Sequence, residues 1–321
     1  MKKHTEKTNM TANENQNKVN IQQHEKTEFE SIIDYAMLNG GIGFMAMKGF
    51  GKTRTLFSIA NYLQQQPKIR VLIFDPSDAW LYSYSKIPVF NIADNDITIK
   101  EQKTSMDMEQ FSFNTWKLTE LALRSNKDLL IRLKSKSPSK RGFAIRTIIN
   151  YLDDLQRSEK ERSPTHENKF SIAYIIEEFS DCMNNRLTAR LEAETFLSLF
   201  NEARNFSEAF FTCQQYECDS AKTLRVKQIS ALGKLSESQK MPYHRKLERL
   251  YNLNLSDMKP RTWLIEGKKI TVPNWSQVGK PFIINRTLRA QYSQTQQKKK
   301  YPSFAKALTL TLLGLNHWYM A

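Results

Sequence analysis

Residues Met45 to Thr53 read MAMKGFGKT and place two glycines before a lysine and a threonine. A triphosphate is held by several backbone N–H groups aimed at one point, and a glycine-rich turn provides them where side chains would clash. Lys52 is placed to reach the terminal phosphates, and the Thr53 hydroxyl to ligate Mg²⁺. We therefore predict a loop that binds ATP with Mg²⁺, through Lys48, Gly49, Phe50, Gly51, Lys52, Thr53 and Arg54.

The loop departs from the pattern GxxxxGK[ST] at its first position, where Ala46 replaces glycine. Its surroundings fit the motif, because the apolar run GIGFMAM before it predicts a buried strand and residues 52–63 carry apolar side chains at helical spacing. A surface turn that happens to contain GKT is the alternative. The strand and helix on either side favour the nucleotide loop.

Glu177 and Glu178 directly follow the apolar run IAYII. Hydrolysis of ATP needs one acid near the metal ion and one carboxylate that orients the attacking water. We assign the first role to Glu177, which would share the metal with Thr53, and the second to Glu178. The alternative is that two acids simply end a strand.

Two further residue types in this half of the chain suit the same chemistry. Gln214 and Gln215 end the apolar run AFFTC, where an amide can contact the γ-phosphate, and the choice between them stays open. Arg204 is a candidate to stabilise charge on the leaving phosphate, in a neighbouring subunit's site. A helix-end arginine that complements the helix dipole is the competing interpretation of Arg204.

Strands alternate with helices along the chain, which predicts an α/β fold with a mostly parallel central sheet flanked by helices. We expect this ATPase domain to span residues 28–290, after a disordered polar leader at 1–27 and before a basic linker and short apolar helix at 291–321. The expected helices cover residues 29–38, 52–63, part of 108–125, 142–157, 187–206 and 236–250. The expected strands cover residues 41–47, 68–76, 88–92, 128–133, 172–176, 209–213 and 226–235.

The formal charge of +15 points to a polyanionic partner. No acid lies between Asp128 and Asp153, and a stretch of this kind engages phosphates without reading sequence. A solvated basic surface is the alternative. The residues predicted to contact nucleic acid are Arg132, Lys134, Lys136, Lys140 and Arg141.

The size of the chain excludes a small disulfide scaffold, and its three cysteines without paired spacing fit reduced thiols. The polar N-terminus argues against secretion. We expect a protein of the host cytoplasm or of a virion. The apolar part of the C-terminal tail is too short for a confident membrane span, which needs about 20 residues. Contact of the tail with a capsid protein or a membrane surface is a further expectation.

Taken in order, these motifs resemble the FtsK/HerA superfamily of DNA-pumping ATPases, which includes conjugative coupling proteins and viral packaging ATPases. AMKGFGKT resembles the family's phosphate loop, VLIFDP its second strand, IIEE its metal strand, FFTCQ its glutamine strand and VKQISALGKLSES its last core strand. The resemblance spans Gly41 to Leu250 and implies a RecA-like P-loop NTPase that forms a hexameric ring around DNA. Glu177 departs from it, since aspartate is commoner there.

The resemblance and the short chain favour an ATP-driven DNA translocase that packages a viral genome. A filamentous-phage assembly, secretion-type or conjugative-coupling ATPase is one alternative. A nucleotide-regulated DNA-binding scaffold with little turnover is another, and it differs in showing no ATP hydrolysis stimulated by DNA.

Overall fold

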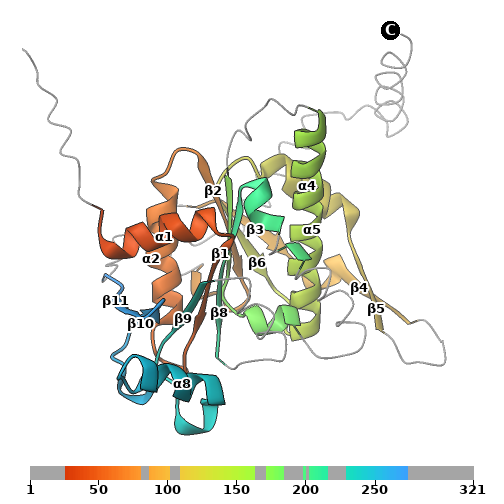
Figure 1. Ribbon diagram of the computed structural model, residues 1–321. Helices are drawn as coiled ribbons and strands as arrows, with labels where there is room; N and C mark the ends of the chain where they lie inside the picture. The colour runs from red at the N-terminus through yellow and green to blue at the C-terminus, as the bar shows by residue number, and fades with distance from the viewer. Residues whose placement is uncertain are drawn as a thin grey trace, which may run out of the picture.

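The computed structural model describes residues 26–80, 87–101, 109–162, 171–183, 198–199, 202–215 and 229–273. Its centre is a nine-stranded sheet with the order β11-β10-β9-β1-β8-β7-β2-β6-β3 (Figure 1). All neighbouring strands from β9 to β3 are parallel, and β10 and β11 are antiparallel additions at one edge. The predicted α/β class with a mostly parallel sheet is confirmed.

Most strands of this sheet are short and apolar, as expected where both faces are covered, whereas three of the four residues of the last strand are exposed. In chain order they are β1 Gly41–Met45, β2 Ile69–Asp75, β3 Val89–Ile92, β6 Leu129–Leu133, β7 Ser171–Ile176, β8 Glu208–Gln214, β9 Ile229–Leu232, β10 Thr262–Ile265 and β11 Lys268–Thr271.

Helices cover both faces of the sheet (Figure 1). On one face lie α1, Glu28–Leu38, and α2, Lys52–Gln64, and on the other lie α4, Thr115–Arg124, and α5, Pro138–Arg162. Successive side chains of a strand point to opposite faces. In β2, Val71 and Ile73 pack in the core under α1 and α2, while Leu72 and Phe74 pack under α4 and α5. The sheet therefore divides the interior into two apolar layers.

The segment 109–124 differs from the expected helix in its first half. Residues Glu109–Phe113 form strand β5, which pairs with β4, Ile97–Glu101, in a separate two-stranded antiparallel sheet. The turn Asp94–Asp96 precedes β4, and α4 starts only at Thr115, after Asn114 caps it by accepting a hydrogen bond from the Trp116 N–H. A five-residue strand with little apolar content gives a weak period-two signal, which is why it was missed.

The helix expected over 236–250 is divided in two. Ser236 and Gln239 do form a capping box, but it caps the 3-10 turn Glu237–Gln239, and α8, Pro242–Leu250, is a separate helix. Pro242 lacks an N–H group, so it begins a helix readily and cannot continue one. The prediction of a single helix was therefore wrong.

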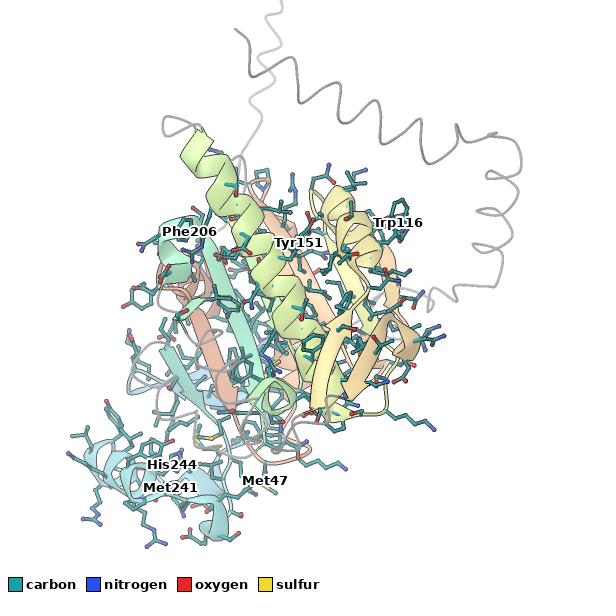
Figure 2. All side chains as sticks on the ribbon, turned by 90° about the vertical axis from the view of Figure 1, so that its right-hand side faces the viewer. Met47, Trp116, Tyr151, Phe206, Met241 and His244 are labelled. Atoms are coloured by element: carbon teal, nitrogen blue, oxygen red, sulfur yellow. The ribbon has the colours of Figure 1, made fainter. Side chains whose placement is uncertain are left out.

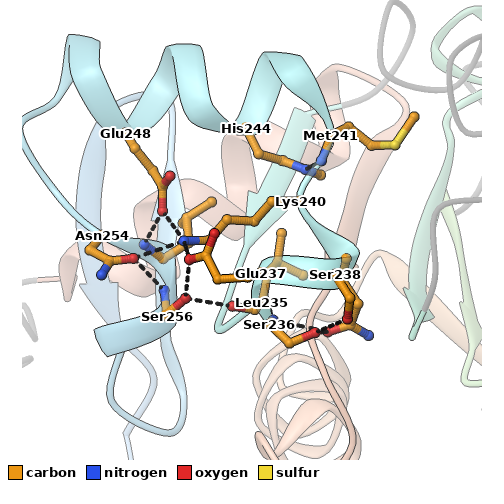
Figure 3. A network of polar contacts seen from close by, with 12 residues as sticks. Leu235, Ser236, Glu237, Ser238, Lys240, Met241, His244, Glu248, Asn254 and Ser256 are labelled. Carbon is orange, nitrogen blue, oxygen red and sulfur yellow. Dashed lines mark hydrogen bonds and ion pairs between the residues drawn. The ribbon is translucent and has the colours of Figure 1, made fainter.

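A buried lysine holds the segment around α8 together (Figure 3). The Lys240 ammonium lies 2.7 Å from Glu248 Oε1 and 2.9 Å from Asn254 Oδ1, and its side chain is only 2 % exposed. Glu237 adds a second carboxylate at 2.5 Å. The Ser256 hydroxyl donates to Glu237 Oε1 at 3.1 Å and to the Leu235 carbonyl at 3.0 Å, which ties the turn Leu255–Asp257 to the segment that follows β9.

The hairpin of β10 and β11 was not predicted. It extends the sheet beyond β9, with Leu264 opposite Leu232 and Ile265 opposite Ala231. Of the helix expected over 187–206, the structure describes only residues 198–199 and 202–206, the last four as a 3-10 turn. The predicted leader, apart from residues 26 and 27, and the C-terminal tail lie outside the described residues. Within the described part, no helix is long and apolar enough to span a membrane.

Candidate nucleotide-binding site

Four neighbouring strands bring the predicted motifs to one edge of the sheet. Their register pairs Met45 of β1 with Gln214 of β8, and Ile176 of β7 with Thr212 of β8 and Phe74 of β2. Because the strands are parallel, their carboxyl ends all meet at this edge, where ligands bind in open α/β sheets. Figure 2 shows Met47 of the loop at the same end of the molecule as Met241 and His244 of the α8 region.

The loop between β1 and α2 has the backbone form that a phosphate requires. Gly49 and Gly51 have φ angles of 80° and 95°, in the left-handed region that other residues avoid. Gly51 is the N-cap of α2 and supplies no side-chain cap, so the first N–H groups of the helix are left for a ligand. The Lys52 ammonium donates to the carbonyls of Ala46 and Met47 at 2.8 and 2.9 Å.

Ala46 is accommodated by a glycine on the neighbouring strand end. A Cβ atom on Gly233 would lie 2.7 Å from the Ala46 Cβ and 2.4 Å from the Phe50 ring. Backbone bonds hold the two segments together, since the Gly233 N–H donates to the Met45 carbonyl at 2.8 Å and the Met47 N–H to the Lys234 carbonyl at 2.9 Å. The missing first glycine of the motif is thus offset by Gly233, which sequence spacing alone did not reveal.

A chain of polar contacts links the loop to the acids of β2 and β7. The Thr53 hydroxyl donates to the Glu177 carboxylate, whose other oxygen accepts from the Ser77 hydroxyl at 3.3 Å. Ser77 also donates through its N–H to the buried Asp75 carboxylate at 3.1 Å. The two predicted metal ligands, Thr53 and Glu177, are therefore in direct contact although 124 residues separate them.

The charges of this cluster are poised for a cation and a phosphate. Burial raises the pKa of Glu177, and the charges of Asp75 and Glu178 raise it further, while hydrogen bonds from Thr53 and Ser77 oppose the shift. Burial also lowers the pKa of Lys52. A hydroxyl and a carboxylate are donors that suit Mg²⁺, which is usually bound by one or two protein groups together with substrate phosphates and water. The residues present fit a Mg²⁺–nucleotide complex.

Glu178 lies beside the loop among residues of both charges. Burial and the Asp181 carboxylate raise its pKa, whereas Lys52, Arg141 and a hydrogen bond with Gln215 lower it. The Arg141 guanidinium pairs with Asp181 at 2.8 Å and donates to the carbonyls of Ser135 and Lys136. Arg141, which was predicted to contact DNA, therefore lies near Glu178. Asp181 was not predicted to belong to this site.

The two glutamines at the end of β8 have different surroundings. Gln215 is hydrogen bonded to Glu178. The Gln214 amide oxygen is buried and has no hydrogen-bond partner among the described residues. Such an atom is costly to leave unpaired, so it marks a place where a ligand group or water fits.

Arg204 is not brought to this edge of its own chain. It belongs to the turn Ala203–Phe206, which precedes β8 and so lies at the amino end of that parallel strand. A role across a subunit interface stays a prediction.

The other basic residues predicted to contact nucleic acid divide into two groups. Arg132 forms a two-pronged ion pair with Asp78, and Lys140 pairs with Asp94 at 2.8 Å. Lys134 and Lys136 are exposed on the connection between β6 and α5. Of the five, these two are the most available to an external phosphate, and DNA contact by the set stays a prediction.

No protein-family model matches the sequence, and no curated protein matches it either.

Within the described part of the chain, no group of three His, Cys, Asp or Glu side chains forms a metal site by itself. The predicted Mg²⁺ site differs from such a cluster because phosphates complete it.

Solved structures similar to the chain include a viral genome-packaging NTPase and a conjugative coupling protein. The genome-packaging NTPase B204 of Sulfolobus turreted icosahedral virus 2, in complex with ATPγS, is 11% identical over 74% of this chain and 99% of that one, with a TM-score of 0.43. The bacterial conjugative coupling protein TrwB, without its first 70 residues, is 10% identical over 78% of this chain and 89% of that one, with a TM-score of 0.48.

Proposed function

We propose that the chain is a Mg²⁺-dependent ATPase of the FtsK/HerA type that moves DNA, as a genome-packaging motor does. The observation that carries the proposal is the contact between the Thr53 hydroxyl and Glu177, beside a loop in which Lys52 and the N–H groups of α2 face the same edge. A surface turn would not be joined in this way to an acid 124 residues further along.

The residues divide the work as follows. The loop N–H groups and Lys52 bind and orient the phosphates, and Thr53 and Glu177 would hold Mg²⁺, which neutralises charge on the phosphates when bound. Glu178 accepts the proton of the attacking water, and a hydrogen bond with Gln215 holds its carboxylate in place. Gln214, with an unpaired amide oxygen among the described residues, contacts the water or the terminal phosphate.

The catalytic part of the proposal is tested with two variants. Lys52→Ala is expected to weaken ATP binding, whereas Glu178→Gln keeps ATP binding and loses turnover by about 10²–10⁴-fold, the usual contribution of a general base. ATP affinity is measured by calorimetry and turnover by phosphate release. Equal turnover in Glu178→Gln and wild type would remove Glu178 from its role.

DNA transport is the second part of the proposal and needs a separate test. The basic surplus and the exposed Lys134 and Lys136 support it, together with the order of motifs along the chain. The subunits would form a ring of six, with Arg204 of one completing the site of the next. Turnover should rise when duplex DNA is added. A chain that hydrolyses ATP at one rate with and without DNA would be an ATPase but no DNA motor.

A further inference from the structure

Arg261, at the start of the unpredicted β10–β11 hairpin, lies directly against the phosphate loop. Its N–H donates to the Phe50 carbonyl at 3.0 Å, and its own carbonyl accepts from the Val272 N–H at 3.0 Å. Its φ angle of 63° is left-handed, a conformation that costs free energy in any residue but glycine. The backbone contacts on both sides hold Arg261 in this conformation.

The side chain of Arg261 occupies the space that Gly51 leaves open. A Cβ atom on Gly51 would lie 2.7 Å from the Arg261 Cγ and 3.5 Å from its Cδ. The absence of a side chain at Gly51 thus lets the arginine stem pass over the N-cap of α2. Gly51 therefore gives the loop its left-handed backbone and also leaves room for the hairpin side chain.

Aromatic contacts fix the hairpin to the same loop. The Trp263 indole N–H donates to the Thr55 hydroxyl at 3.1 Å, and its ring meets Phe50 edge-on with centroids 5.0 Å apart. Trp263 and Thr55 are fully buried. The position of Arg261 relative to the loop is therefore rigid.

The charge of Arg261 is not balanced by the described part of the chain. No ion pair or hydrogen bond joins its guanidinium to any other described residue, and it lies at the positive end of the α2 dipole, close to Lys52. A cation at this end of a helix is unfavourable without an anion. A bound polyphosphate is the anion that the loop itself is built to hold.

From these observations we infer that Arg261 is a nucleotide-binding residue, whose guanidinium contacts the phosphates of the nucleotide held by residues 49–53. The inference rests on the proposed nucleotide site but adds a residue outside its motifs.

The test compares Arg261→Met, which keeps the stem and removes the charge, with Arg261→Lys, which keeps both a stem and a charge. Binding of ATP and of inorganic tripolyphosphate is measured by calorimetry, with thermal unfolding as a check of the fold. Arg261→Met is expected to weaken both ligands about tenfold, with Arg261→Lys in between. Lys259→Gln, which removes an exposed charge two residues away, should bind both as wild type does.

The outcomes separate this inference from the proposed function. Wild-type protein that binds neither ligand would overturn both. Wild-type binding with unchanged affinities in Arg261→Met would overturn the inference alone. The inference alone would also be overturned if Arg261→Met lost affinity for ATP but kept its affinity for tripolyphosphate, since Arg261 would then contact the nucleoside. If Arg261→Met unfolds, Arg261→Lys alone decides, because a lysine is expected to bind tripolyphosphate less tightly than the guanidinium fork does.

Discussion

At the scale of single residues, the Thr53 hydroxyl is proposed to have two roles. It lies in the first turn of α2, within the reach of a phosphate, and it donates to Glu177 from another strand. Removing the hydroxyl should leave the loop backbone unchanged but would deprive the proposed metal site of one donor. Its effect should therefore depend on Mg²⁺.

Thr53→Ala is expected to lower turnover about a hundredfold, because the metal ion would lose a direct ligand. Thr53→Ser keeps the hydroxyl and should retain most of the activity. Nucleotide affinity is measured with Mg²⁺ and with EDTA for both variants. An equal response of wild type and Thr53→Ala to EDTA would contradict the assignment of this hydroxyl to the metal.

Glu208, at the opposite end of β8, is a buried acid that lies outside the nucleotide site. Its carboxylate accepts from the Tyr174 hydroxyl at 2.9 Å, and burial raises its pKa from 4.5 to about 8. The folded protein thus holds a proton that the unfolded chain releases. This contribution to stability is complete below pH 4.5 and is lost as the pH rises toward 8.

In that window, the Glu208 contribution lowers the free energy of unfolding by up to about 1.4 kcal/mol per pH unit. Glu208→Gln cannot titrate, so its stability should depend less on pH between 5 and 8. Urea denaturation at a series of pH values gives the two slopes. Parallel slopes for wild type and variant would show that Glu208 is ionised in the folded protein.

At the scale of elements, α5 is joined to the segment that follows β7. A Cβ atom on Gly142 would lie 1.8 Å from the Asp181 carbonyl oxygen, so the helix and the turn Phe179–Met183 are in backbone contact. The Arg146 guanidinium donates to the Cys182 carbonyl at 2.6 Å across the same contact. The connection that carries Lys134 and Lys136 is therefore mechanically linked to the surroundings of Glu178.

Gly142→Ala should destabilise the fold by about 1–3 kcal/mol, as overpacking does, although alanine is the better helix former. The displaced turn should also lower turnover more than ATP affinity. Thr147→Ala, on the same helix and half-buried, serves as the control and should change stability little. A stabilised Gly142→Ala would show that α5 and the turn are not in close contact.

Some elements of the fold and the site could be predicted from the sequence, and others could not. The loop and Glu177 were predictable because each belongs to a short local pattern, a strand that ends in the residues concerned. Gly233, Asp181 and Arg261 were not, because their roles depend on contacts with residues far along the chain. Strand β5 was missed because five residues, EQFSF, carry too little alternation to be recognised.

At the scale of the whole molecule, the proposed motor must contact DNA and a neighbouring subunit. Most of the predicted basic residues are paired within the chain, which leaves Lys134 and Lys136 exposed beside α5. Arg204 belongs to the opposite edge of the sheet from its own loop. Both placements suit contacts made by an assembly.

Replacing Lys134 and Lys136 together by Gln should weaken binding of duplex DNA and reduce the slope of log K against log salt by about 2, since two phosphate contacts are lost. Fluorescence anisotropy at several salt concentrations measures the slope. The matched control is Lys68→Gln with Lys269→Gln, which removes the same charge from exposed positions elsewhere. Equal slopes in the two double variants would mean that DNA binding depends on the overall charge of the protein and not on contacts made by Lys134 and Lys136.

A mixing experiment tests the role of Arg204 across subunits. Arg204→Ala alone and Glu178→Gln alone should each have little activity. Mixed, they should regain part of it, because some interfaces then combine an intact Arg204 with an intact Glu178. Activity of the mixture that equals the mean of the two separate variants would place Arg204 outside the reaction.

The position of β1 in the sheet has a consequence for how the protein is made. Among the described strands its partners are β8 and β9, which begin at residues 208 and 229, so the strand before the phosphate loop lacks these partners until those residues have emerged from the ribosome. Contacts of such long separation form slowly. The ability to bind nucleotide should therefore arise late in synthesis. Nucleotide binding would then distinguish the completed fold from a partly synthesised chain.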